Sequence, residues 1–241
     1  LDLIRRLVAR DVTVAIGHTD ATWSDAAAAA AAGARLGTHI FNAMRPIHHR
    51  EPGAVGYLLA SDLAVSIIAD GLHLAPGMLQ LVGRLKAPDE LIVITDALAA
   101  LGMPPGTFGL AGVEIVSDGT SARRADGTLS GSLVALDQAI RNLVALGLPR
   151  ESAVRAVTVN PARLLGLESS HGRVAVGRAA DLVLLDEAWN VEATLIAGRF
   201  VHGRVAGRGP RPGCTARSCS SQTPSGGPWP SSPRQPTPPP R

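Results

Sequence analysis

Four short apolar runs in this sequence each lead to a residue that can bind a metal or carry a proton. These residues are His18, His39, His73 and Asp96. Neutral imidazoles held on rigid strand ends suit a divalent transition metal such as Zn²⁺ or Fe²⁺, and a carboxylate beside an activated water can act as a general base. Because one histidine at a strand end is more often a structural group, the evidence for a site is the repetition of the pattern.

Two of these residues are open to different interpretations. Asp96 follows the apolar stretch 90–95, and its carboxylate is either the N-cap of the segment 97–101 or a general base at the mouth of a site. His73 follows the pair Asp70-Gly71, and it is a metal ligand, a carbonyl polariser or a core histidine. Its loop context favours the first two of these roles.

Polar groups also gather in the loop that follows His39. Asn42 either orients polar substrate atoms or holds the loop in place. Arg50 lies beside His48 and His49, so the loop carries a positive cluster. Surface solvation is the ordinary explanation for such charges, whereas clustering near a site indicates an anionic substrate group, because a guanidinium matches phosphate or carboxylate geometry.

The elements that must position these residues are strands and helices in alternation. Runs without in-out alternation are typical of parallel strands that are covered on both faces. The spacing of the four key residues is the size of a βα unit, so the pattern predicts an α/β fold containing part of a TIM-like (β/α)8 barrel, in which chemistry occurs at the strand carboxyl ends. We expect strands at 12–16, 35–41, 64–69 and 90–95, and helices at 2–10, at 26–32 with Ser24 as the cap, and from about 75 onward.

The second half of the chain predicts different elements. A glycine-rich stretch, 108–132, predicts a hairpin insertion, and two amphipathic helices should follow, the second interrupted at Asn160-Pro161. Short strands with glycine turns predict a small β appendage, and the proline-rich end predicts disorder. The resulting domain boundaries are residues 1–166 for a partial hydrolase barrel, 167–206 for the β appendage and 207–241 for a disordered tail.

Composition narrows the class of protein. The 241 residues are 46% apolar, enough for one sizeable core, and only 3% aromatic. The net charge of +3 comes from five arginines after residue 206; subtracting them from the 23 basic residues leaves 18 against 20 acidic ones, which gives no support for nucleic-acid binding. No run approaches the ~18 apolar residues of a membrane span. We therefore expect a soluble cytoplasmic protein without nucleic-acid or membrane partners.

Other sequence features limit the chemistry further. Cys214 and Cys219, the two cysteines, both lie in the polar tail and imply no disulfide framework. No serine-nucleophile elbow, Walker loop or dinucleotide fingerprint is present, so serine hydrolases and nucleotide-binding enzymes are disfavoured. Because the chain begins at Leu1, in what reads as the end of a helix, we expect it to be a fragment.

Several motifs, taken in order, resemble the N-acetylglucosamine-6-phosphate deacetylase family of the amidohydrolase superfamily. The resemblance covers about residues 1–203 and is specific in order and spacing. The motifs are GHTDAT (17–22), THIFNAM (38–44), HHREPG (48–53), ADGLH (69–73), VITDA (93–97) and GTLSGS (127–132), followed by NPARLLGL and GRVAVGRAADLVLLD.

This resemblance implies a role for each matching residue and a C-terminal half of the barrel as the fold. It implies a divalent metal, Zn or Fe, and hydrolysis of the N-acetyl group of an amino sugar phosphate, in which a water activated by the metal and deprotonated by the acid/base attacks the amide carbonyl. It also implies a homodimer. The implied residues are His18 and His39 as metal ligands, Asp96 as acid/base, Asn42, Ala43 and Arg50 at the sugar phosphate, His73 near the acetamide, and Leu129 to Ser132 at the acetyl pocket.

One departure from the family pattern affects the expected activity. The early strands, an HxH segment and an acidic metal ligand have no counterpart here, so we expect this chain alone to be inactive or poorly folded. Two alternatives stay open beside the deacetylase: another amidohydrolase that acts on a cyclic amide, and a non-catalytic remnant that binds sugar phosphate or a partner subunit.

Overall fold

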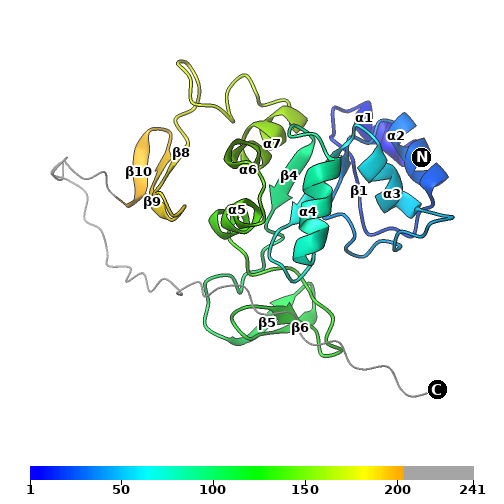
Figure 1. Cartoon of the computed structure of the whole chain (residues 1–241), viewed down its shortest axis with the longest axis horizontal. Coiled ribbons are helices and arrows are strands. Elements are labelled where there is room, and N and C mark those ends of the chain that lie inside the picture. Colours follow the sequence, from blue (N-terminus) through cyan, green and yellow to red (C-terminus); the bar gives the residue numbers. More distant parts are fainter. Residues whose placement is uncertain (204–241) are drawn as a thin grey trace. The chain divides into compact units, whose positions relative to one another are not determined.

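A computed structural model describes residues 1–203 of the chain. These residues fall within one compact unit, and the proline-rich tail that the sequence predicts to be disordered lies outside the described residues. Helices and a parallel sheet alternate along the first half, so the expected α/β class is confirmed (Figure 1). The boundary between a barrel portion and an appendage near residue 166 stays a prediction.

A four-stranded parallel sheet, in the order β1-β2-β3-β4, is the centre of the unit. β3 and β4 are apolar and buried, with Val65, Ile67 and Ile68 fully enclosed. Enclosing each such side chain contributes about 1.5–3 kcal/mol. Their register pairs Val65 with Leu91 and Ile68 with Ile94. The strands are β1 (Ala15–Ile16), β2 (Leu36–Gly37), β3 (Ala64–Ile68) and β4 (Leu91–Ile94).

Helices cover the sheet in groups. In Figure 1, α5, α6 and α7 lie beside β4, against which all three pack, while α3 packs on β3 and α2 on α3. Within the described part of the chain, no helix is long and apolar enough to cross a membrane. The helices are α1 (Asp2–Val8), α2 (Trp23–Ala31), α3 (Gly53–Ala60), α4 (Pro76–Leu85), α5 (Leu136–Ala145), α6 (Arg150–Val157) and α7 (Val159–Leu164).

Two antiparallel sheets complete the described residues. The predicted hairpin insertion is present, with a turn at Asp118-Gly119, and the predicted glycine-turn strands near the end form a second small sheet. The first sheet has the order β5-β6-β7 and the second the order β10-β9-β8. Their strands are β5 (Gly106–Leu110), β6 (Val113–Ser117), β7 (Ala122–Arg123), β8 (Leu182–Leu185), β9 (Val191–Ile196) and β10 (Arg199–Gly203).

The structure corrects several local expectations, and the strand expected at 12–16 is only Ala15–Ile16. Thr22, not Ser24, caps α2, because Thr22 and Asp25 form a reciprocal capping box. The strand expected at 35–41 is only Leu36–Gly37, since the chain leaves the sheet at Thr38. The helix break expected at Asn160-Pro161 occurs instead at Thr158, and Pro161 sits in the first turn of α7, where its missing N–H costs no helical hydrogen bond.

Candidate active site

Three of the proposed site residues lie just past the carboxyl ends of parallel strands, in an uncommon backbone conformation. His18, His39 and Asp96 follow β1, β2 and β4 and have φ angles of 43°, 32° and 49°. The left-handed region costs a residue with a side chain roughly 1–2 kcal/mol, and such residues cluster where a site over-determines the backbone. The carboxyl edge of the sheet therefore carries polar groups in left-handed conformations. Other described residues in this conformation lie elsewhere, at Asp11, Ala111, Trp189 and Ala197.

The two histidines are the pair that the structure brings into contact. The ring centroids of His18 and His39 lie 4.7 Å apart with an angle of 77° between the rings. His39 is buried, and its Nδ1 has no hydrogen-bond partner among the described residues. Two close imidazoles with a free nitrogen fit two ligands of a divalent transition metal. Within residues 1–203 no third ligand-type side chain joins them.

Ser66, which the sequence reasoning missed, helps to hold His39. The main-chain N–H of His39 donates to Ser66 Oγ at 2.9 Å, and Ile40 donates to the Ser66 carbonyl at 3.0 Å. Ser66 is buried in β3. A serine inside an otherwise apolar strand was the signal that could have identified it, because buried hydroxyls need hydrogen-bond partners.

Asp96 is exposed and does not cap a helix, so the N-cap interpretation is wrong. Its main chain is fixed by Ser132: the Ser132 N–H donates to the Asp96 carbonyl at 2.8 Å, and Leu98 donates to the Ser132 carbonyl at 3.1 Å. Strands are spaced about 4.8 Å apart, so β2 and β4 lie about 10 Å apart across the sheet. The hydrogen bonds of Ser132 also bring the segment containing Leu129 to the end of β4. Leu129 is half-buried and paired with Arg123.

The loop after β2 is held by its own polar groups. The Asn42 side-chain amide donates to the carbonyls of His39 at 3.2 Å and Ile40 at 3.3 Å, as the loop-holding interpretation expects. Ala43 is exposed with a φ of 51°. Arg45, which sequence reasoning did not single out, forms two 2.8 Å hydrogen bonds to Asp20 and so ties this loop to the one after β1. Contacts of Asn42 and Ala43 with a substrate stay predictions.

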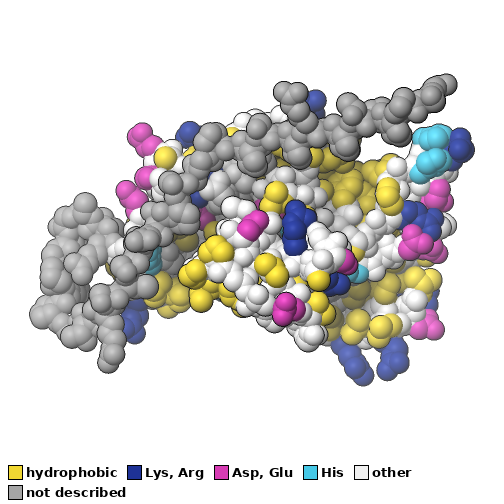
Figure 2. Space-filling view, turned by 90° about the horizontal axis from the view of Figure 1, so that it is seen from below, with side chains coloured by type: hydrophobic (Ala, Val, Ile, Leu, Met, Phe, Trp, Pro, Cys, Tyr) yellow, Lys and Arg dark blue, Asp and Glu magenta, His cyan; other side chains and the backbone are white. Residues whose placement is uncertain are grey.

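The positive cluster of the loop lies on the surface. Arg50 is exposed, and its Nη1 lies 2.8 Å from His49 Nε2. The rings of His48 and His49 are 4.2 Å apart. Figure 2 shows histidine side chains gathered beside a basic one on its face of the molecule. An exposed guanidinium with imidazole neighbours is available to an anion, although solvation alone would also allow this exposure.

His73 is paired with a carboxylate that sequence reasoning did not assign to it. Its Nδ1 lies 2.6 Å from Asp70 Oδ2, and both side chains are more than nine-tenths enclosed. Burial acts to raise the pKa of Asp70, but the hydrogen bonds from the His73 side chain and main chain outweigh it and hold that pKa below its usual value. The pair comes just after β3, which is the strand between β2 and β4 in the sheet.

Two hollows in the described part of the surface do not coincide with these residues. These adjoining hollows, of about 340 and 460 Å³, lie between α4 and the α5–α6 connection and share Gly83, Arg84 and Leu91. Leu91 begins β4, whereas Asp96 follows its other end. Because the chemical groups lie at the opposite edge of the sheet, we do not assign these hollows to the substrate.

A parallel sheet with imidazoles and a carboxylate at its carboxyl edge has groups suited to metal-assisted hydrolysis. Residues 2–201 match the sequence model of the amidohydrolase family, and the chain belongs to that family.

Relatives of this chain carry more specific names than the family does. Human N-acetylglucosamine-6-phosphate deacetylase is 41% identical over 215 residues, which are 86% of this chain and 52% of that protein. Escherichia coli N-acetylgalactosamine-6-phosphate deacetylase is 39% identical over 202 residues, 83% of this chain and 53% of that protein. The Mycobacterium smegmatis N-acetyl-D-glucosamine-6-phosphate deacetylase, solved as a variant with N-acetyl-D-glucosamine-6-phosphate, is 42% identical with a TM-score of 0.79, covering 83% of this chain and 54% of that one. The chain spans about half the length of the curated relatives it matches.

Proposed function

We propose that the protein removes the acetyl group from N-acetylglucosamine 6-phosphate and that its parallel sheet is the C-terminal half of a TIM-like barrel. The observation that carries this proposal is the pair of imidazoles 4.7 Å apart at the carboxyl edge of the sheet that also bears Asp96. The similarity to named deacetylases supports the choice of reaction. The proposed boundaries are residues 1–166 for the barrel portion and 167–206 for the β appendage, of which 204–206 lie outside the described residues.

His18 and His39 would hold a divalent metal, Zn or Fe, which supplies Lewis-acid activation of water and of the amide carbonyl. Asp96 accepts a proton from the attacking water and returns it to the leaving amine, so its exposed carboxylate serves first as base and then as acid. His73 contacts the acetamide. Products are glucosamine 6-phosphate and acetate.

The loop after β2 provides the proposed phosphate grip. The Arg50 guanidinium and the amides of Asn42 and Ala43 contact the sugar phosphate, and the segment beginning at Leu129 lines the acetyl pocket. Arg50 supports this assignment because it is exposed and interacts with an imidazole. We further propose a homodimer.

Acetate release from N-acetylglucosamine 6-phosphate, with and without a chelator, tests the proposed function. In a protein that contains this chain and also supplies an acidic metal ligand, we expect turnover that the chelator abolishes and added metal restores. The 241-residue chain alone should show none. Arg50→Ala should raise KM for the phosphorylated sugar, with Arg35→Ala, on a different loop, as the control. An equal effect of Arg50→Ala on unphosphorylated N-acetylglucosamine would contradict phosphate recognition, and ligand binding without any turnover would identify a non-catalytic remnant.

The N-acetylgalactosamine 6-phosphate epimer is the second candidate substrate, because one relative of nearly equal identity carries that name. A substrate panel containing both epimers and a cyclic amide separates these activities. We expect the highest kcat/KM for the glucosamine derivative; preference for the cyclic amide would transfer the protein to a different amidohydrolase activity.

A further inference from the structure

The turn after β3 is built around the Asp70 carboxylate. Its Oδ1 accepts the main-chain N–H of Leu72 at 2.9 Å and that of His73 at 2.8 Å, while Gly71 supplies a φ of 77°. Its Oδ2 lies 2.6 Å from His73 Nδ1. Both carboxylate oxygens therefore have hydrogen-bond partners, and all three bonds are made with Leu72 and His73.

These bonds determine which nitrogen of His73 carries the proton. An ionised carboxylate only accepts hydrogen bonds, so the ring must donate from Nδ1 to Asp70. The hydrogen bonds that Asp70 receives hold its pKa below the usual value, which keeps it ionised near neutral pH. With Nδ1 committed, Nε2 is the ring atom left to meet a substrate.

A third residue fixes the strand end that carries this pair. Asn142 of α5 is buried, and its Nδ2 donates to the Ala69 carbonyl at 2.7 Å. Its Oδ1 accepts from Gln138 Nε2 at 2.7 Å, so the amide orientation is set from both sides. Helix α5 is thereby tied to the residue just before Asp70.

We propose that Asp70 is a positioning residue that holds the His73 ring, with its proton on Nδ1, so that Nε2 faces the acetamide of the substrate, and that Asn142 fixes the strand end bearing this pair. The proposal rests on the proposed function of the site. Asp70 does not touch the reacting atoms. It acts through His73, and it leaves binding of the sugar phosphate to other residues.

Asp70→Asn tests this directly because it keeps the shape of the side chain and reverses one bond. The Asn carbonyl can still accept from the main chain, whereas its amide would face Nδ1 and move the ring proton to Nε2. Nitrogen-15 NMR of the purified protein should show His73 protonated at Nδ1 in the wild type and at Nε2 in the variant. A wild-type ring protonated only at Nε2 would overturn the proposal whether or not the protein is an active deacetylase.

Kinetics of the whole protein provide the second readout. Asp70→Asn should lower kcat roughly 10- to 100-fold with KM within about twofold, as expected when an orienting partner is lost. In a His73→Gln background the same change should have no further effect on kcat. Asp181→Asn is the matched control, since Asp181 lies 3.7 Å from His171 on the exposed β8–β10 side; it should leave kcat unchanged.

The outcomes separate the two proposals. Absence of deacetylase turnover in a wild-type protein that also supplies an acidic metal ligand, with the Nδ1 proton in place, would reject the function and keep the pairing. Additive losses in the double variant would reject a role of Asp70 through His73. Because Asp70 is buried, thermal unfolding of each variant is measured in parallel. Asn142→Ala is the second variant for NMR, in case Asp70→Asn does not fold. It should broaden or shift the His73 signals without changing the tautomer of the ring.

Discussion

The two edges of the parallel sheet both carry buried polar residues, but these residues are satisfied differently. At the amino edge, Lys86 donates to the main-chain carbonyls of Leu58 and Ser61 and pairs with Glu90 at 2.9 Å. At the carboxyl edge, His39 keeps an unpartnered buried nitrogen, and three site residues have left-handed backbone conformations. In a barrel of parallel strands, the first pattern is typical of stability and the second of function.

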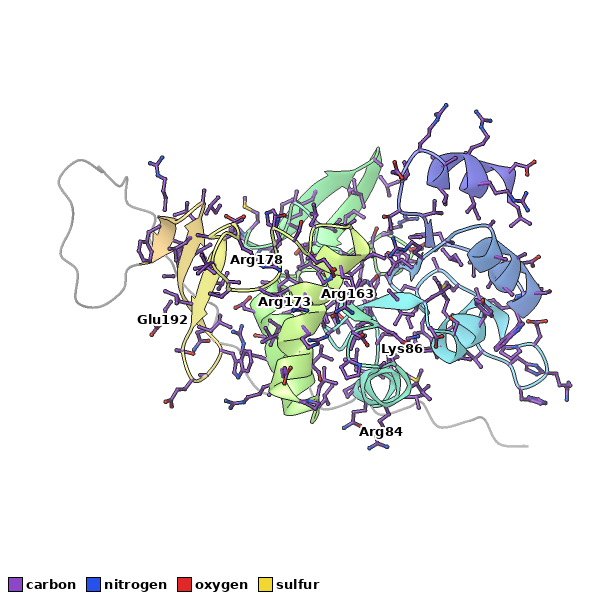
Figure 3. All side chains as sticks on the ribbon, turned by 90° about the horizontal axis from the view of Figure 1, so that it is seen from above. Arg84, Lys86, Arg163, Arg173, Arg178 and Glu192 are labelled. Atoms are coloured by element: carbon purple, nitrogen blue, oxygen red, sulfur yellow. The ribbon has the colours of Figure 1, made fainter. Side chains whose placement is uncertain are left out.

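Figure 3 makes the contrast at the amino edge visible. Arg84 projects outward from α4, whereas Lys86, two residues later, lies among the ribbons. The Lys86 side chain is 1% exposed. Asn160 plays a related part in α7, where its amide donates to the carbonyls of Pro88 at 2.8 Å and Leu91 at 2.7 Å. Lys86 binds main chain at the end of α3 and Asn160 binds main chain at the start of β4, so their nitrogen atoms have a structural explanation. Asn160 Oδ1, like His39 Nδ1, is buried without a partner among the described residues.

The largest expected effect is at the carboxyl edge. Asp96→Asn should lower kcat by about 10²–10⁴-fold, because the acid/base is lost, while substrate affinity and the unfolding temperature stay close to wild type. Asp89→Asn, which removes a 3.1 Å ion pair with Arg163 at the other edge, is the control and should leave kcat within about twofold. Steady-state kinetics check both variants. Equal kcat values for Asp96→Asn and wild type would remove Asp96 from its role.

Stability should respond in the opposite way. Lys86→Met leaves two main-chain carbonyls and Glu90 without their partner, so the free energy of unfolding should fall by about 3 kcal/mol. Arg84→Met, on the exposed side of the same segment, should change it by less than about 0.5 kcal/mol. Urea denaturation measures both values. Similar losses in the two variants would show that burial of Lys86 does not matter.

A smaller effect is expected at Asp118, in the turn between β6 and β7. Main-chain hydrogen bonds from Ser121 and Thr120 lower the pKa of Asp118 to about 2. A group with a depressed folded-state pKa stabilises the fold above its unfolded pKa and loses that contribution as pH falls, here between about pH 4 and 2. After allowance for solvent screening, Asp118→Asn should cost about 1 kcal/mol at pH 7. Unfolding free energies at pH 7 and pH 2.5 check this, and a cost that persists undiminished at the lower pH would contradict it.

The smallest expected effect concerns backbone strain. Ala43→Gly and Ala111→Gly, at φ angles of 51° and 49°, should each stabilise the fold by about 0.5 kcal/mol, because glycine adopts the left-handed region without a steric cost. Only Ala43 lies in the proposed site, so only its variant should change KM. Calorimetry and steady-state kinetics provide the readouts. A KM change in Ala111→Gly would mean that the hairpin also reaches the substrate.

The sequence predicted the layers better than it predicted the loops that form the site. Continuous apolar runs identified β3 and β4, because burial on both faces removes the alternation of polar residues. The chain leaves β2 after Gly37 through left-handed His39 and Phe41. Phe is an unusual residue for that conformation, so composition gave no signal for this turn. Helix α3 was missed because its sequence, GAVGYLLA, contains two glycines.

The site residues show the same difference between what the strands predict and what the loop contacts decide. Strand ends indicated His18, His39 and Asp96 correctly as residues of one edge, because parallel strands bring their carboxyl ends together. Ser66 and Asp70 could not be assigned as partners of His39 and His73, since those contacts depend on the exact direction of short side chains. The specific roles of the site residues stay predictions.

Metal binding by the histidine pair is the most direct measurement of the difference between the two edges. Titration of the metal-free protein with Zn²⁺ should show binding that His18→Gln and His39→Gln each weaken by more than about 100-fold, beyond the 10- to 100-fold typical of outer-shell changes. His171→Gln, an exposed histidine outside the site, should bind as the wild type does. Unchanged affinity in His18→Gln and His39→Gln would contradict the assignment of the carboxyl edge as the metal centre.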